Sequence, residues 1–214
     1  MTKIKAKKFR LPNIIYNHVK ANIKAYIIVS LMFIVGIFLG VLFLNNTKDD
    51  QKEEISLYIN NYIEKTKDTK EINTVGTLKN SIRENITLAV GLWFAGTTLI
   101  GIPIVFGIIL FRGFCLGYTI SACTYTMGVS KGLAFVLISL LLQNILLIPA
   151  ILALGVSGIK LYKSVMKDKR KENIKVEILR HTVFSCMMLG VLVVSAIVKI
   201  NISGGMLETL IKYF

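Results

Sequence analysis

A serine and a histidine are the residues of this chain whose types and setting could support covalent catalysis. Ser157 lies in the string Gly-Val-Ser-Gly at residues 155–158, which fits the GxSG pattern of intramembrane serine proteases, and His181 begins the next apolar stretch. In such a pair the imidazole takes the proton of the serine hydroxyl as its oxygen attacks a carbonyl carbon. One GxSG string in a glycine-rich sequence is a weak signal, and no oxyanion donors can be assigned. We therefore expect Ser157 to pack at a helix end and His181 to lie at the membrane interface.

Other catalytic groups are scarce in the sequence. His18 is the second histidine, no HExxH string occurs, and the apolar stretches contain no Asp or Glu. Without intramembrane carboxylates the chain can be neither an aspartyl intramembrane protease nor a carboxylate proton relay. We predict a protein that is not an enzyme, and we assign no catalytic, cofactor-binding or metal-binding residue.

A charge and two amides interrupt the longest apolar part of the sequence. Residues 86–159 contain only two formal charges, Arg112 and Lys131. Arg112 lies either in a turn between two membrane helices or inside the membrane as a functional charge, because an unpaired charge in hydrocarbon is costly. Gln143 and Asn144 fall near the middle of a predicted span, where lipid offers no hydrogen-bond partner. These amides could clamp two helices together or line a substrate path.

The composition places the chain among integral membrane proteins. Its 214 residues are 54% hydrophobic and its mean hydropathy is +0.64. Apolar runs of this length occur in helices that span a bilayer and not in soluble cores. The net charge of +14 would suggest nucleic acid binding in a soluble protein, but here the basic residues flank apolar runs. We therefore predict an all-α integral membrane protein that contacts the lipid bilayer and binds no nucleic acid.

We predict about five transmembrane helices, with a short extracytoplasmic helical segment after the first. The long central run is divided at its two charges, which we place in turns between spans. The predicted spans are residues 25–44, 86–110, 114–130, 132–159 and 182–198. On this division Arg112 lies in a tight cytoplasmic turn, where it supports the topology at little desolvation cost.

The distribution of charge orients these spans. Residues 1–24 carry seven basic residues and no acid, and residues 160–181 carry eight basic and three acidic residues. Residues 45–85 carry seven basic and eight acidic residues. Because cytoplasmic segments are enriched in Lys and Arg, we predict a basic amphipathic segment (1–24) and a basic loop (160–181) in the cytoplasm. The N-terminus is then cytoplasmic, and residues 199–214 form an extracytoplasmic amphipathic tail at the C-terminus.

The extracytoplasmic segment, residues 45–85, is the only sizeable predicted part outside the membrane. Apolar side chains at helical spacing predict two short amphipathic helices within it. Ile55, Tyr58, Ile59 and Tyr62 form an apolar stripe on the first of them. About forty residues cannot bury an independent core, so the stripe needs the membrane, the rest of the chain or another protein. Our hypothesis is that it contacts a partner protein.

Small residues in the predicted spans are spaced for close helix packing. Gly36 and Gly40 lie four residues apart on the first span, and Gly113 and Gly117 do so on the third. Such pairs let two helix backbones approach closely. The pattern leaves open whether they pack within one chain or in a homo-oligomer.

Three motifs, in matching order and spacing, make the chain resemble the stage II sporulation protein M family. They are residues 33–40 with their paired glycines, residues 82–86 leading through Gly96, Gly101 and Pro103 to residues 112–117, and Lys131-Gly132 followed by residues 142–150. Together with the matching hydropathy they extend over roughly residues 20–200.

The resemblance implies a multi-pass cell-membrane protein of endospore-forming bacteria that acts at the septal membrane during engulfment of the forespore. It implies a non-enzymatic scaffold, needed for septal membrane migration and without a cofactor. Its expected partners are the stage II sporulation proteins D and P, which remodel peptidoglycan and which it recruits and holds at the membrane. The alternative is a membrane subunit of a transporter-like or ATP-driven complex, whose separate ATPase would bind the basic segment 160–181.

Overall fold

The computed structural model describes residues 16, 18–68, 74–98, 100–137, 142–167 and 171–211. Side chains are described for these residues except 65–68, 74–75, 142–143, 167, 171–173 and 200–211. The elements are α2 (Ile23–Asn45), α3 (Asp49–Asp68), α4 (Thr74–Thr97), α5 (Gly101–Met127), α6 (Val129–Val136), α7 (Leu142–Lys167) and α8 (Lys171–Ile211). No strand occurs in the ranges given above. The prediction of an all-α protein is confirmed.

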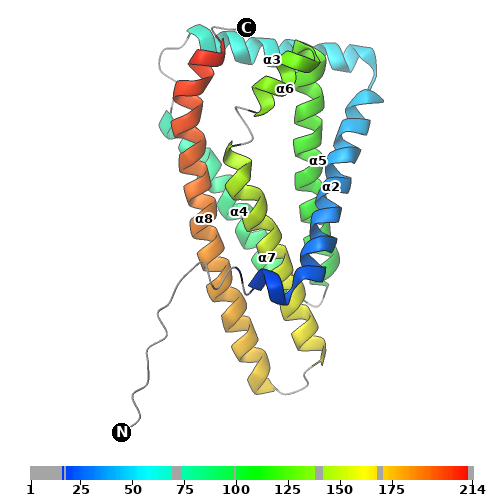
Figure 1. Cartoon of the computed structure of the whole chain (residues 1–214), viewed down its shortest axis with the longest axis vertical. Helices are drawn as coiled ribbons and strands as arrows, with labels where there is room; N and C mark the ends of the chain where they lie inside the picture. The colour runs from blue at the N-terminus through cyan, green and yellow to red at the C-terminus, as the bar shows by residue number, and fades with distance from the viewer. Residues whose placement is uncertain are drawn as a thin grey trace.

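Four helices are long and apolar enough to cross a membrane. The candidate spans are Ile23–Asn45, Gly101–Met127, Asn144–Met166 and Ile174–Lys199. Helix α4 runs beside them, from the end of the bundle that α3 covers to the end where α5 begins (Figure 1). The first half of α4 carries Lys79, Arg83 and Glu84, so it does not qualify by composition. The chain thus forms a bundle of four apolar helices and one half-polar helix.

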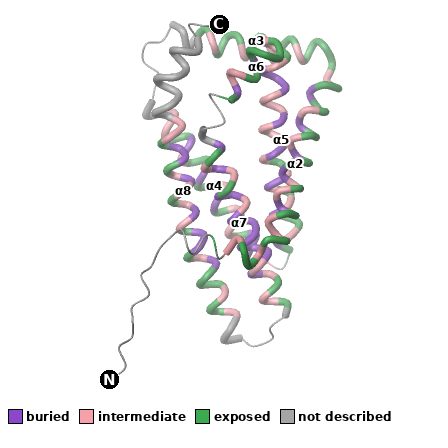
Figure 2. Tube along the Cα trace, in the orientation of Figure 1, coloured by how far each residue is buried: buried purple, intermediate pink, exposed green. Residues whose placement is uncertain are grey.

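Helix α7 occupies the centre of the bundle. Its candidate span is 61% buried, against 28% for the spans in α2 and α5. Leu147, Ile151 and Leu154 of α7 are almost fully buried, whereas Leu31 and Phe38 of α2 are exposed. Figure 2 shows this contrast, with buried residues gathered along the inner helices. An outer surface of large apolar side chains suits contact with lipid tails.

The prediction of a turn at Arg112 is wrong. Helix α5 continues through Arg112 from Gly101 to Met127, and the chain reverses direction before it, between α4 and α5. In this turn the Gly101 N–H donates to the Thr98 carbonyl over 3.1 Å. Pro103 then lies in the first turn of α5, where a missing N–H has little cost. The predicted spans 86–110 and 114–130 are therefore replaced by α4 and α5.

Other predicted boundaries also shift. Gly128, with φ of 81°, separates α5 from α6, and the predicted fourth span, 132–159, includes parts of two helices, α6 and α7. The predicted loop at 160–181 is wrong for its described residues, because α7 continues to Lys167 and α8 begins at Lys171. The predicted last span, 182–198, is the middle of the 41-residue α8. Most of residues 1–24 lie outside the described part of the chain.

Candidate functional site

Glycines on both helices hold α5 against α2. Any side chain at Gly36, Gly40, Gly113 or Gly117 would meet the backbone of the other helix. A Cβ atom at Gly117, for example, would lie 2.8 Å from the carbonyl carbon of Ile37. The small residues therefore let α2 and α5 pack backbone to backbone. This contact fixes one side of α5 and thereby orients its other side.

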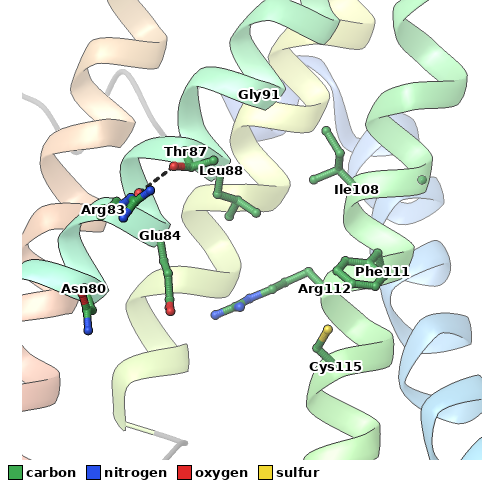
Figure 3. Close-up of a pocket in the computed structure, with 11 residues that line it drawn as sticks. Asn80, Arg83, Glu84, Thr87, Leu88, Gly91, Ile108, Phe111, Arg112 and Cys115 are labelled. Atoms are coloured by element: carbon green, nitrogen blue, oxygen red, sulfur yellow. Dashed lines mark hydrogen bonds between the residues drawn. The ribbon is translucent and has the colours of Figure 1, made fainter. Parts of the chain in front are cut away.

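The other side of α5 borders an open groove of about 850 Å³ against α4 (Figure 3). Arg112 extends from α5 toward α4, and the carboxylate of Glu84 on α4 points into the same space. Asn80 adds an amide to this part of the groove, whereas Leu88 and Ile108 make its other part apolar. Arg112, which was predicted to lie in a turn, thus lies within a candidate membrane span and faces a groove.

A smaller cavity of about 190 Å³ adjoins the groove and shares Glu84 and Arg112 with it. Its walls include Asn144 of α7, which is buried, and Lys199 of α8. No hydrogen bond or ion pair within the described part of the chain neutralises the side chains of Arg112 or Lys199. An arginine at the centre of a membrane helix costs about 2.5–3.5 kcal/mol on insertion. Glu84 supplies one carboxylate to the same cavity, so Arg112 and Lys199 leave a net positive charge there. A net charge inside a membrane bundle points to a functional role.

Two polar contacts fix α4 on α8 and so determine which face of α4 lines the groove. The Asn85 amide nitrogen donates to the Leu192 carbonyl over 2.8 Å, and both ends of this bond are buried. The Trp93 indole N–H donates to the Thr182 hydroxyl over 3.1 Å. Interhelical bonds of this kind contribute about 0.6–2 kcal/mol each in a membrane. With α4 fixed on that side, Glu84 is left facing α5.

Ser157 and His181, the candidate catalytic pair, are in contact. The Ser157 hydroxyl oxygen and His181 Nδ1 are 2.9 Å apart, and His181 Nε2 is 3.4 Å from the Trp93 carbonyl oxygen. If Ser157 donates to Nδ1 and Nε2–H donates to Trp93, a neutral imidazole satisfies all three groups. His181 is buried, which corrects its predicted place at the interface.

The surroundings of this pair favour a clamp over a nucleophile. Ser157 lies inside α7 and not at a helix end as predicted. Backbone N–H groups there bond to carbonyls four residues earlier, so none is free to stabilise an oxyanion. The three groups come from α4, α7 and α8, and Gly96 and Gly158 allow α4 and α7 to touch beside them. The network therefore ties three helices together.

His18 ties the segment before α2 to α8. Its ring stacks on Phe184 with centroids 4.4 Å apart, and its Nδ1 is 3.1 Å from the Tyr26 hydroxyl. Burial, and then the positive charge of Lys160, lower the pKa of His18 from 6.5 to about 4. His18 is therefore neutral at pH 7 and serves as a packing residue.

The predicted apolar stripe on α3 is divided between two environments. Ile55 and Ile59 are half-buried and line a cavity of about 530 Å³ over α5 and α6. Tyr58 and Tyr62 stand at its rim and are 73% and 55% exposed. A 3.1 Å hydrogen bond joins the Ser56 hydroxyl to a threonine hydroxyl near the end of α5. Ile55 and Ile59 thus pack α3 against the bundle, while Tyr58 and Tyr62 remain exposed to solvent or to a partner.

Among the predicted site residues, the structure brings Arg112 and Asn144 together and places the four glycines at one contact. The side chain of Gln143 lies outside the described residues. Glu84 and Lys199 share the cavity with Arg112 and are absent from the predicted site residues. A signal for the first was present, because Asn80, Glu84 and Thr87 are spaced to share one face of a helix. No three His, Cys, Asp or Glu side chains gather at a metal-binding distance among the residues searched.

Comparison with known families identifies one match. The family model described as stage II sporulation protein M matches residues 29–203, which is most of the chain. No curated protein and no solved structure matches the chain at a significant level. The matched region extends from α2 into α8 and includes the groove, the cavity and α3.

Proposed function

The chain belongs to the stage II sporulation protein M family, and we propose that it is a non-enzymatic membrane scaffold of forespore engulfment. Membership makes it a sporulation-related protein, and its apolar helices make it a multi-pass membrane protein. In the proposed role it is required for septal membrane migration. It recruits and holds the stage II sporulation proteins D and P, which remodel peptidoglycan, at the septal membrane.

The observation that carries this proposal is the placement of α3. This helix lies across one end of the bundle (Figure 1) and is anchored there through Ile55 and Ile59. Leu57 and Tyr58 remain 57% and 73% exposed on it. Tyrosine and other large apolar side chains on a rigid support are typical of the centres of protein interfaces. A fixed helix that displays them suits the capture of a partner.

We further propose that α3 faces the outside of the cell, where peptidoglycan is remodelled. Helices α2 and α8 begin, and α7 ends, toward the end of the bundle opposite α3 (Figure 1). These parts of the sequence carry the basic residues Lys20, Lys24, Lys160, Lys163, Lys175 and Arg180. Helix α3 opens with the acids Asp49, Asp50, Glu53 and Glu54. Because basic residues favour the cytoplasmic side, this asymmetry supports a cytoplasmic start of α2 and an extracytoplasmic α3.

The test is a pair of charges placed on the exposed face of α3. The double variant Leu57→Glu, Tyr58→Glu should lose the partners because charges replace the apolar contact, while Ile55 and Ile59 still seat the helix. The measurement is recovery of the stage II sporulation proteins D and P with a tagged copy of the chain from membranes of sporulating cells. Septal localisation of both partners by fluorescence is read in the same cells.

The matched control carries the same charges on the same helix. Asn60 and Asn61 are exposed and polar, so the double variant Asn60→Glu, Asn61→Glu should keep both partners. Equal membrane levels of the two double variants exclude a folding defect. Normal recovery of both partners by the Leu57, Tyr58 variant would refute the proposed role of α3.

One observation favours the alternative of an ATP-driven complex. The hairpin of α7 and α8 extends beyond the start of α2 (Figure 1), and its sequence is strongly basic. A projecting basic hairpin offers a docking surface for a cytoplasmic ATPase. Co-purification of an ATPase that is lost when Lys167, Lys169, Arg170 and Lys171 are neutralised would favour this alternative. Absence of any ATPase from a crosslinked native complex would count against it.

A further inference from the structure

The groove between α4 and α5 changes character along its length. One part carries charged and amide groups, from Asn80, Arg83 and Glu84 of α4 and Arg112 of α5. The other part is apolar and is lined by Leu88, Gly91, Gly107, Ile108 and Phe111 (Figure 3). An occupant that matches both parts has a polar headgroup joined to a hydrocarbon chain.

Two glycines keep the apolar part of the groove open. Nothing lies within 4 Å of a Cβ atom added to Gly107, and a Cβ atom on Gly91 would meet only the Ile108 side chain, at 3.9 Å. Glycine in a helix interior costs about 0.5–1 kcal/mol relative to alanine, and here no protein contact uses the space it leaves. The uncovered glycines therefore leave room for something other than a neighbouring helix.

The polar part of the groove carries an excess of positive charge. Arg83, Glu84 and Arg112 line it, and Lys199 shares the adjoining cavity with Glu84 and Arg112. Arg112 lies eleven residues after the first residue of α5, which is about 17 Å along the helix axis. An anion bound there would offset the cost of the half-buried charges of Arg112 and Lys199. The guanidinium fork also matches phosphate oxygens in a bidentate geometry.

We propose that this groove binds one anionic phospholipid, with its phosphate on Arg112 and an acyl chain over Gly107. The groove volume of about 850 Å³ suits a headgroup and part of its chains, since ligand pockets measure about 300–1,000 Å³. The site is separate from α3 and independent of the scaffold role proposed for it.

Native mass spectrometry of the purified, delipidated full chain tests this proposal. The probes are phosphatidylglycerol, phosphatidylcholine and glycerol phosphate, added to separate samples. We expect phosphatidylglycerol to bind about tenfold more tightly than phosphatidylcholine, because only the former carries a net negative headgroup. Glycerol phosphate, which has no acyl chain, should not be retained. If it binds as tightly as the whole lipid, the groove is a site for free phosphate anions and the lipid proposal fails.

Two glycine variants separate the groove from the rest of the bundle. Gly107→Leu fills the apolar part without altering a charge, and it should abolish retention of phosphatidylglycerol. Gly190→Leu is the matched control, because Gly190 also lies in a helix with nothing within 4 Å of an added Cβ atom and it does not line the groove. Retention should be unchanged in this control. If Gly107→Leu retained phosphatidylglycerol as well as the unmodified chain, the proposal would be overturned. This outcome does not depend on whether variants at the charged residues fold.

Two variants that each remove a charge from the groove test whether the ligand is negatively charged. Arg112→Gln should reduce the preference for phosphatidylglycerol to near parity with phosphatidylcholine. Glu84→Gln should strengthen binding, because it removes a carboxylate that repels the phosphate. Weaker binding in Glu84→Gln, or equal binding of both lipids to the unmodified chain, would overturn the proposal. Crosslinking of two copies through a cysteine at position 107 in native membranes would instead make the groove a helix interface.

Discussion

Helix α5 presents glycines to both of its sides, and the two sides are used differently. On the side of Gly113 and Gly117 the backbone of α2 closes over the glycines, so that no side chain could be added there. On the side of Gly107 nothing lies within 4 Å of an added Cβ atom, and Arg112 faces the open groove. The first side holds the bundle together, and the second leaves a charged space within it.

This difference teaches that a glycine motif in a membrane helix has no single meaning. Glycine pairs four residues apart are commonly taken to indicate helix packing, and on one side of α5 they do. Gly107 belongs to the same helix but leaves space for another molecule. Only the neighbour across the glycine distinguishes the two cases.

The largest expected effect comes from breaking the closed side. Gly117→Leu forces a side chain into the backbone of α2 near Ile37, and overpacking of this kind costs about 1–3 kcal/mol or more. We expect a large fall in the melting temperature in detergent, measured by the fluorescence of Trp93. Gly107→Leu adds the same side chain on the open side and should leave the melting temperature unchanged. Equal losses in the two variants would show that the sides do not differ.

The second expected effect concerns Arg112 on the open side. Because Arg112 forms no ion pair with a described side chain, Arg112→Leu removes a costly charge without breaking one. We expect the free energy of unfolding to rise, by up to about 2–3 kcal/mol. Denaturant titration of the delipidated protein measures it. A fall in the free energy of unfolding of similar size would mean that Arg112 stabilises the fold. The open side of α5 would then contribute to stability as the closed side does.

Much of the closed side could be predicted from the sequence, whereas the open side could not. Local sequence patterns predict the first span at residues 25–44, the amphipathic helix α3 and the glycine pairs. The predicted turn at Arg112 is wrong because a charge need not mark a turn. The real turn before Gly101 carries no charge. Glu84 and Lys199 line one cavity with Arg112 from two other helices, α4 and α8. Their convergence depends on tertiary packing, which no periodicity in the sequence reports.

A smaller effect is expected at the helix clamp formed by Ser157. Ser157→Ala removes its hydrogen bond to His181, and such interhelical bonds average about 0.6 kcal/mol in membranes. The melting temperature should fall slightly, while septal localisation and sporulation efficiency stay normal. Loss of sporulation at normal protein levels would instead assign chemistry to the pair and would contradict a non-enzymatic role.

The smallest expected effect is a pH dependence at His18, outside the membrane spans. Its pKa is about 4 in the folded chain and near 6.5 in the unfolded chain. As the pH falls from 7 toward 4 the unfolded state takes up the proton first, so stability falls over this window. His18→Asn should weaken this fall between pH 7 and 4.5, as measured by melting temperature. An identical pH profile in the variant would exclude His18 as its source.

The continuity of α5 through Arg112 is the claim on which the contrast between its two sides rests, and cysteine labelling tests it most directly. Single cysteines at positions 100 and 112 of a Cys-free variant are treated with a membrane-impermeant thiol reagent from each side of the membrane. Cysteines at Met166 and Tyr58, which are exposed at opposite ends of the bundle, calibrate the two sides. We predict that position 100 reacts from the same side as position 166 and that position 112 does not. Rapid labelling of position 112 from that side would place a turn at Arg112 and contradict the account.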